Sequence, residues 1–143
     1  MKSFILIIFL NFALFAAHID DFAKAMEFER DYSTALTKAK KEDKILMFVL
    51  SADYCPWCRK FENKTLRSKV LKPILDQDVI SLVVDKKYDA SSFPKKFITH
   101  FTPKVFFINP HTGDILGETT GYVKKKDFAS SLSNIVELYR VKP

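Results

Sequence analysis

The chain has 143 residues, which suits a single domain with its own hydrophobic core. Hydrophobic residues make up 48% of it, with 14 phenylalanines but only 3 glycines and 6 prolines, which excludes a disordered or low-complexity protein. The formal charge of +6 comes from lysines scattered along the chain without a nucleic-acid-binding motif. We therefore expect no nucleic-acid partner, and the charge leaves an acidic protein partner open.

The N-terminal segment, residues 1–17, has the charge-then-apolar order of a secretory signal peptide, with Lys2 followed by a long apolar run. A membrane-spanning helix needs about 20 apolar residues, so this run is short for a permanent anchor. We expect cleavage after Ala17, a mature domain over residues 18–143, and export to a compartment in which disulfides form. A buried helix and an uncleaved anchor are the alternatives.

The first half of the domain predicts helices and buried strands in alternation. Residues 21–42 carry apolar residues among many charges, which fits one long amphipathic helix or two helical pieces. The apolar run 45–50 has the length of a buried strand, and residues 79–84 predict a second one. Between these strands, apolar residues at helical spacing predict a helix after residue 55, and Pro73 begins a further helical turn.

The second half predicts a short helix, a hairpin and a closing helix. A polar loop over residues 85–92 leads into a short apolar helix and its exit over residues 93–101. Residues 102–110 and 115–120 predict antiparallel strands joined by a turn, and residues 124–140 form an amphipathic helix. The element order predicts an α/β fold with parallel strands, an antiparallel edge pair and helices on both faces of the sheet.

The two cysteines of the chain, Cys55 and Cys58, fall where the first strand turns into a helix. Cys55 lies at or beside the N-cap, and Pro56 fits the first helical position, where a missing N–H costs nothing. The free N–H groups and the positive dipole end of that helix favour a thiolate at Cys55. Cys58 lies on the same helix face and close enough to form a disulfide with Cys55. This arrangement is typical of reversible dithiol chemistry.

The element order, the sequence Tyr-Cys-Pro-Trp-Cys over residues 54–58 and the pair Thr102-Pro103 together resemble the thioredoxin superfamily. The resemblance covers about residues 31–140. The chain is most similar to exported bacterial thioredoxin-like proteins, including those associated with sulfur oxidation and periplasmic thiol reduction. The resemblance implies a three-layer sandwich in which helices flank a central mixed β-sheet.

The resemblance also assigns roles to residues of the motif. It implies that Cys55 is the attacking thiolate and that Cys58 resolves the mixed disulfide. We expect no tightly bound cofactor, because the cysteine pair itself cycles, and no metal. Pro103 occupies the position of the family's cis-proline, which faces the disulfide. Thr102 is expected to offer its backbone to a substrate segment. Trp57 either helps to hold the substrate or is a half-buried aromatic residue.

Three departures from the thioredoxin pattern leave the redox potential open. Val49 stands where many thioredoxins have a buried aspartate, and Phe101 replaces the glycine that often precedes the Thr-Pro pair. The dipeptide between the cysteines is Pro-Trp, which is neither the Gly-Pro of thioredoxin nor the Pro-His of the strong periplasmic oxidant. We expect a periplasmic oxidoreductase that acts on protein or small-molecule thiols and disulfides. We favour a reductase that is supplied by an upstream electron-donor protein, for which a membrane-bound protein is one candidate.

Other interpretations of the cysteine pair compete with this one. A zinc site needs four ligands, and His18, His100 and His111 lack close spacing to the cysteines. A purely structural disulfide would enclose too few residues to stabilise the fold much through loop entropy. Arg59 either adds positive potential beside the cysteines or is a solvated charge. The alternative function is a non-catalytic thioredoxin-fold module that binds a metal ion or a partner protein.

Overall fold

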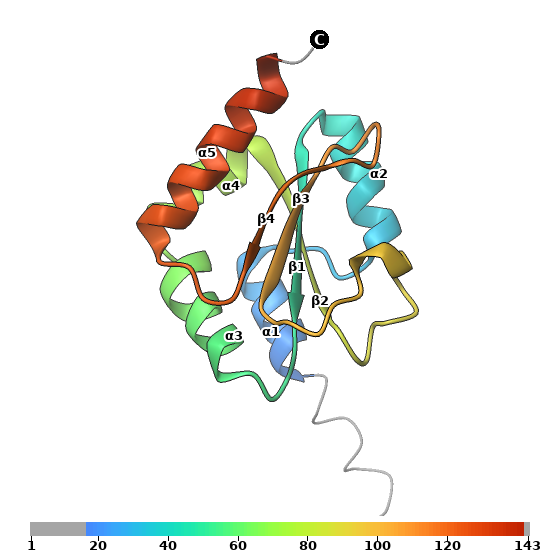
Figure 1. Ribbon diagram of the computed structural model, residues 1–143, viewed down its shortest axis with the longest axis vertical. Helices are drawn as coiled ribbons and strands as arrows, with labels where there is room; N and C mark the ends of the chain where they lie inside the picture. The colour runs from blue at the N-terminus through green and yellow to red at the C-terminus, as the bar shows by residue number, and fades with distance from the viewer. Residues whose placement is uncertain (1–16, 142–143) are drawn as a thin grey trace, which may run out of the picture.

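The computed structural model describes residues 17–141, which form a mixed β-sheet with helices on both faces (Figure 1). The expected signal peptide lies outside the described residues apart from Ala17, the first residue of α1 (Ala17–Met26). Within residues 17–141, no helix has both the length and the apolar character needed to cross a membrane.

The N-terminal region forms two helices, which is one of the two expected outcomes for residues 21–42. Helix α1 ends before Glu27, whose positive φ of 57° interrupts the helical backbone. Helix α2 (Tyr32–Glu42) begins after Asp31, whose side chain accepts a hydrogen bond from the backbone N–H of Thr34. An aspartate at the N-cap satisfies a donor that would otherwise have no partner, which explains where the second helix begins.

The sheet has four strands in the order β2-β1-β3-β4. Strand β1 (Ile45–Ser51) pairs in parallel with β2 (Val79–Asp85) and antiparallel with β3 (Lys104–Ile108). Strand β3 pairs antiparallel with β4 (Ile115–Thr120). The predicted mixed sheet is therefore confirmed. Every residue of β1 and β2 is buried, which is why both strands are predominantly apolar in the sequence.

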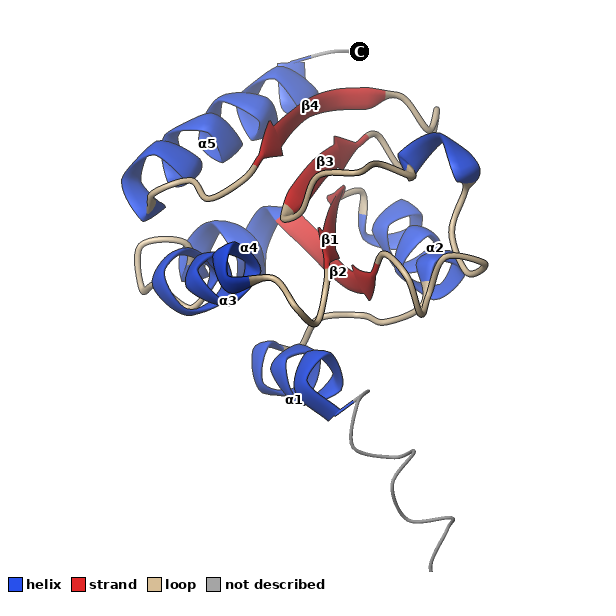
Figure 2. Ribbon diagram, turned by 60° about the horizontal axis from the view of Figure 1, so that its bottom comes forward, coloured by secondary structure: helices blue, strands red, loops and turns tan. Residues whose placement is uncertain are grey.

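One face of the sheet is covered by α1, α3 (Pro56–Phe61), α4 (Lys72–Asp78) and α5 (Lys125–Val141). Figure 2 shows α3, α4 and α5 on the side of the sheet opposite α2. Helix α3 continues into one π-helical turn, Glu62–Leu66. The largest fully buried side chains of this core are Phe22, Ile45, Met47, Phe61, Leu66, Leu71, Phe107 and Phe128.

The other face packs against α2 and a short 3-10 helix, Lys95–Phe97. Its centre is Phe48, whose ring lies 5.3 Å from that of Phe93 and 5.2 Å from that of Phe97, in edge-to-face geometry. Because successive residues of a strand point to opposite faces, β1 supplies side chains to both cores. The sheet is thus packed on both faces beneath the turn at the carboxyl end of β1, where the cysteines lie.

Candidate active site

The cysteine pair lies just beyond the carboxyl end of β1, in the turn that enters α3. Cys55 and Cys58 form a disulfide. Cys55 is the N-cap of α3 and Pro56 its first residue, which confirms both predicted helix positions. The Sγ atom of Cys55 accepts a hydrogen bond from the backbone N–H of Cys58 at 3.1 Å. Cys55 is 8% exposed and Cys58 is fully buried, so the first sulfur lies nearer the surface.

The loop before β3 brings Thr102 against the disulfide. The peptide bond between Thr102 and Pro103 is cis, as expected from the resemblance. The hydroxyl of Thr102 lies 3.5 Å from the Sγ atom of Cys55, and its carbonyl oxygen lies 3.6 Å from the same atom. The carbonyl oxygen of Pro103 accepts a hydrogen bond from the N–H of Gly121 at 2.8 Å, which ties this loop to the end of β4.

Exposed aromatic residues surround the disulfide. Trp57, between the two cysteines, is 55% exposed and stacks on Tyr122, with ring centroids 6.1 Å apart. The ammonium group of Lys60 lies 4.9 Å from the ring of Trp57 and 4.6 Å from that of Tyr122. Tyr54 precedes Cys55 and Phe101 precedes Thr102, and both are largely exposed. We call Tyr54, Trp57 and Phe101 the aromatic rim, an apolar surface of the kind that contacts a partner.

Residues 32–135 match the family model described as a thioredoxin-like domain. The chain belongs to the thioredoxin-like family. Family membership and the Cys55–Cys58 disulfide make this thioredoxin-like protein a thiol–disulfide oxidoreductase. No curated protein sequence matches the chain.

Solved structures of related proteins have the same fold. A thioredoxin from Thermus thermophilus has 18% identity and a TM-score of 0.67, and the match covers 76% of this chain and 85% of that one. The oxidised C-terminal domain of DsbD from Neisseria meningitidis has 18% identity and a TM-score of 0.58, covering 75% of this chain and 97% of that one. A disulphide isomerase from Xylella fastidiosa has 18% identity and a TM-score of 0.52, covering 87% and 92%. These similarities establish the fold of the thioredoxin-like protein.

A buried glutamate lies one helical turn after the second cysteine. Glu62 is 1% exposed, and its backbone N–H donates to the carbonyl oxygen of Cys58. Its carboxylate accepts hydrogen bonds from Ser51 Oγ at 3.0 Å and from Arg59 Nη2 at 2.8 Å, and His18 Nε2 lies 3.1 Å from its other oxygen. A carboxylate is buried only when partners of this kind compensate its lost hydration. The carboxylate thus joins α1, β1 and α3 behind the disulfide.

Glu62 was not among the site residues predicted from the sequence. The available signal is its spacing, because a residue four after Cys58 shares that helix face, and it lies between the apolar Phe61 and Leu66. The structure supports neither of the two interpretations of Arg59. Its Nη2 atom donates to Glu62 and to the carbonyl oxygen of Ala52, so its charge is paired rather than solvated or free.

The three histidines do not gather at the cysteines. His18 pairs with Glu62, His111 pairs with Asp43 at 2.9 Å, and His100 is exposed. Among residues 17–141, no group of three or more His, Cys, Asp or Glu side chains is arranged to hold a metal ion.

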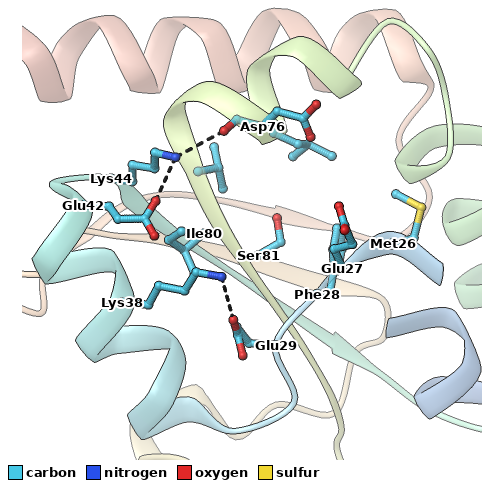
Figure 3. Close-up of a pocket in the computed structure, with 12 residues that line it drawn as sticks. Met26, Glu27, Phe28, Glu29, Lys38, Glu42, Lys44, Asp76, Ile80 and Ser81 are labelled. Atoms are coloured by element: carbon cyan, nitrogen blue, oxygen red, sulfur yellow. Dashed lines mark hydrogen bonds and ion pairs between the residues drawn. The ribbon is translucent and has the colours of Figure 1, made fainter. Parts of the chain in front are cut away.

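A separate hollow lies beside the amino end of β2, where Figure 3 shows charged side chains facing one another. Strand register places Val79 beside Ile45 at this end of the sheet, whereas the cysteines follow Ser51 at the opposite end. Most charged side chains of this hollow form ion pairs with one another. Lys38 pairs with Glu29 and Lys44 with Glu42, each at 3.0 Å. We therefore assign the active site to the cysteine end of the sheet.

Proposed function

We propose that this protein is a periplasmic reductase of disulfides in which Cys55 attacks and Cys58 resolves. The observation that carries the proposal is the environment of the Cys55 sulfur. Once reduced, that sulfur keeps the N–H of Cys58 and the hydroxyl of Thr102 as donors at the start of a helix. Donors of this kind stabilise a thiolate, which is the attacking species. Cys58 is fully buried, whereas Cys55 is 8% exposed, so Cys55 is the more accessible sulfur.

The reaction balances as two exchanges. The Cys55 thiolate attacks one sulfur of a substrate disulfide, which forms a mixed disulfide and releases one substrate thiolate. Cys58 loses its proton and attacks the Cys55 sulfur, which forms the Cys55–Cys58 disulfide and releases the second thiolate. Two electrons and two protons pass from the dithiol to the substrate. A donor protein with its own dithiol restores the reduced state by the reverse exchanges.

Substrate binding is proposed for three residues beside the sulfur. Thr102 and Pro103 form the loop against Cys55, where an extended substrate segment pairs with the Thr102 backbone as an added strand. Trp57 offers an exposed ring between the cysteines. This arrangement supports a protein substrate, and it leaves room for small disulfides that need only the sulfur.

The proposed direction, reduction, rests on what surrounds the thiolate. A strongly stabilised reduced form makes a dithiol an oxidant. In this protein the residues between the two cysteines, Pro56 and Trp57, are neutral. The charge of Arg59 is paired with Glu62, and Lys60 lies over aromatic rings. The Cys55 thiolate therefore has the Thr102 hydroxyl and the Cys58 N–H as donors. We assign no positively charged side chain to it. Equilibration with dithiothreitol buffers tests this: a potential near about −270 mV supports a reductase, and one near about −120 mV overturns it.

The proposed location, the periplasm, rests on the apolar segment of residues 1–17 and on the disulfide. The structure adds that α1 places Ile19 and Phe22 in the core directly after the expected cleavage site, so a domain starting near residue 18 keeps its packing. Cell fractionation and N-terminal sequencing test the location. A cytosolic product with residues 1–17 intact would refute it.

A trapping experiment tests the catalytic roles. Cys58→Ser removes the resolving thiol while Cys55 keeps its helix-end environment, so mixed disulfides with substrates should accumulate and dissolve in dithiothreitol. Cys55→Ser is the matched control and should trap far fewer, because the remaining thiol is buried. If Cys58→Ser captures nothing reducible while Cys55→Ser still binds the same partners, the protein is a binding module and the proposal fails.

A further inference from the structure

A cluster of lysines without ion-pair partners in the described part of the chain lies beside the active site. We call Lys60, Lys64 and Lys124–Lys126 the lysine hollow; they line one depression together with Tyr122 and Asp127. All five lysines are exposed. Within residues 17–141 none of them forms an ion pair, whereas Lys38, Lys44, Lys72 and Lys104 each have a carboxylate within 4.0 Å. The hollow is thus a concentration of uncompensated positive charge.

The stability of α5 does not explain these lysines. Lys125 and Lys126 are the first residues of the helix, where the unpaired N–H groups give the helix end its positive charge. Cations at this end are unfavourable to the helix, and Asp127 is the one acidic residue of its first turn. One aspartate stands against five lysines in this hollow, so the local cost to the helix is not offset within it and points to an anionic group from another molecule.

The lysine hollow and the disulfide are parts of one surface. Lys60 belongs to the hollow and lies over Trp57, and Trp57 lies between the two cysteines. Tyr122 lines the hollow and stacks on Trp57. The segment after α3 is tied to the segment before α5, because the Thr65 hydroxyl donates to the carbonyl oxygen of Val123 at 2.5 Å. A chain that crosses Trp57 from the disulfide in this direction therefore reaches the lysines.

We propose that the lysine hollow binds an acidic segment of the protein substrate, adjacent to the cysteine that Cys55 attacks. The inference rests on the proposed function and adds its substrate class. The occupant of this surface must carry sulfur for the disulfide, apolar groups for the aromatic rim and carboxylates for the lysines. A polypeptide with Asp and Glu beside its disulfide meets all three requirements, whereas lipids and nucleic acids carry no disulfide. Charge complementarity of this kind accelerates association and is screened by salt.

Turnover of three synthetic peptides tests the preference. Each contains one disulfide, flanked by Asp and Glu, by Ser and Asn, or by Lys and Arg. At about 50 mM salt we expect the acidic peptide to be reduced roughly ten times faster than the basic one, and at about 500 mM the difference should largely vanish. Equal rates for the acidic and basic peptides at low salt would overturn the proposal. The neutral peptide separately reports whether the protein is a reductase at all.

Two variants of equal charge change locate the effect. Lys125→Gln with Lys126→Gln should slow reduction of the acidic peptide roughly three- to tenfold. Lys40→Gln with Lys41→Gln removes the same charge from the last turn of α2, beside the amino end of β1, and should leave that rate unchanged. Equal slowing by both variants would mean that net charge alone acts, which contradicts a site at the lysine hollow.

A binding measurement does not depend on turnover. Trp57 is the one tryptophan of the chain, so its fluorescence reports on this surface in the oxidised protein. A cysteine-free acidic peptide should change that fluorescence, and the change should weaken in salt and in the Lys125→Gln, Lys126→Gln variant. Failure to bind better than a basic peptide would overturn the proposal even if disulfide reduction is observed. Equally tight binding of phosphatidylglycerol vesicles would instead identify a membrane-surface site and would also overturn it.

Discussion

Thr102 and Cys55 are 47 residues apart in sequence, yet the hydroxyl of Thr102 lies 3.5 Å from the Cys55 sulfur. In the disulfide that sulfur carries no hydrogen, so the hydroxyl is the donor. When the pair is reduced, the same hydroxyl donates to the thiolate, and a hydrogen bond to a charged sulfur favours the charged form. The loop before β3 thus contributes directly to the reactivity of the cysteine at the start of α3.

Replacing Thr102 with valine should therefore slow the reaction of Cys55 with iodoacetamide at mildly acidic pH. Loss of one donor to a charged group costs about 0.7–1.4 kcal/mol at a partly exposed site, which corresponds to a roughly three- to tenfold lower rate. Thr102→Ser keeps the hydroxyl and is the control. If Val and Ser variants are alkylated at the same rate as the parent, the hydroxyl does not support the thiolate.

The buried carboxylate of Glu62 should matter for folding as well as for the site. Glu62→Gln leaves Arg59 and His18 without their anionic partner, so the free energy of unfolding should fall by about 2–4 kcal/mol. Asp76→Asn breaks an exposed pair with Lys72 and should cost no more than about 0.5 kcal/mol. Urea unfolding of both oxidised variants gives the comparison. Equal losses would show that burial adds nothing to the Glu62 pairs.

Tyr139 links α5 to the end of α2, and its ionisation should lower the free energy of unfolding at alkaline pH. Its hydroxyl donates to Asp43 at 2.7 Å, and burial, reinforced by this bond, raises the pKa of Tyr139 from 10.0 to about 12. The folded state therefore holds the phenolic proton more tightly than the unfolded state does. The resulting stability is fully present below about pH 10 and is lost as the pH rises through about 12.

Tyr139→Phe should consequently lower stability at pH 7 by about 0.5–1.5 kcal/mol and reduce the further loss between about pH 10 and pH 12. Denaturant unfolding of the oxidised protein across that range measures both effects. Tyr88→Phe is the control, because the side chain of Tyr88 is 57% exposed and should change neither value. A parallel loss of stability in the parent and in Tyr139→Phe above pH 10 would contradict the assignment.

The local architecture was predictable from sequence because it is encoded locally. Residues 45–50 and 79–84 are predominantly apolar because both faces of β1 and β2 are covered, and these strands appear where expected. Cys55 and Pro56 mark the start of α3 because an N-cap and a first-turn proline suit the free N–H groups of a helix end. The Thr102-Pro103 pair was recognised only through resemblance to a family.

Tertiary structure alone decided which distant groups meet. In the sequence Glu62 is one charge among many, and it becomes a buried carboxylate only because Ser51, Arg59 and His18 converge on it. The lysine hollow is formed by α3 and the start of α5. Three of the four strands lie between these two helices in the sequence. No local sequence pattern signals either arrangement. The energy of a charge depends on the dielectric and on the partners around it, and folding determines both.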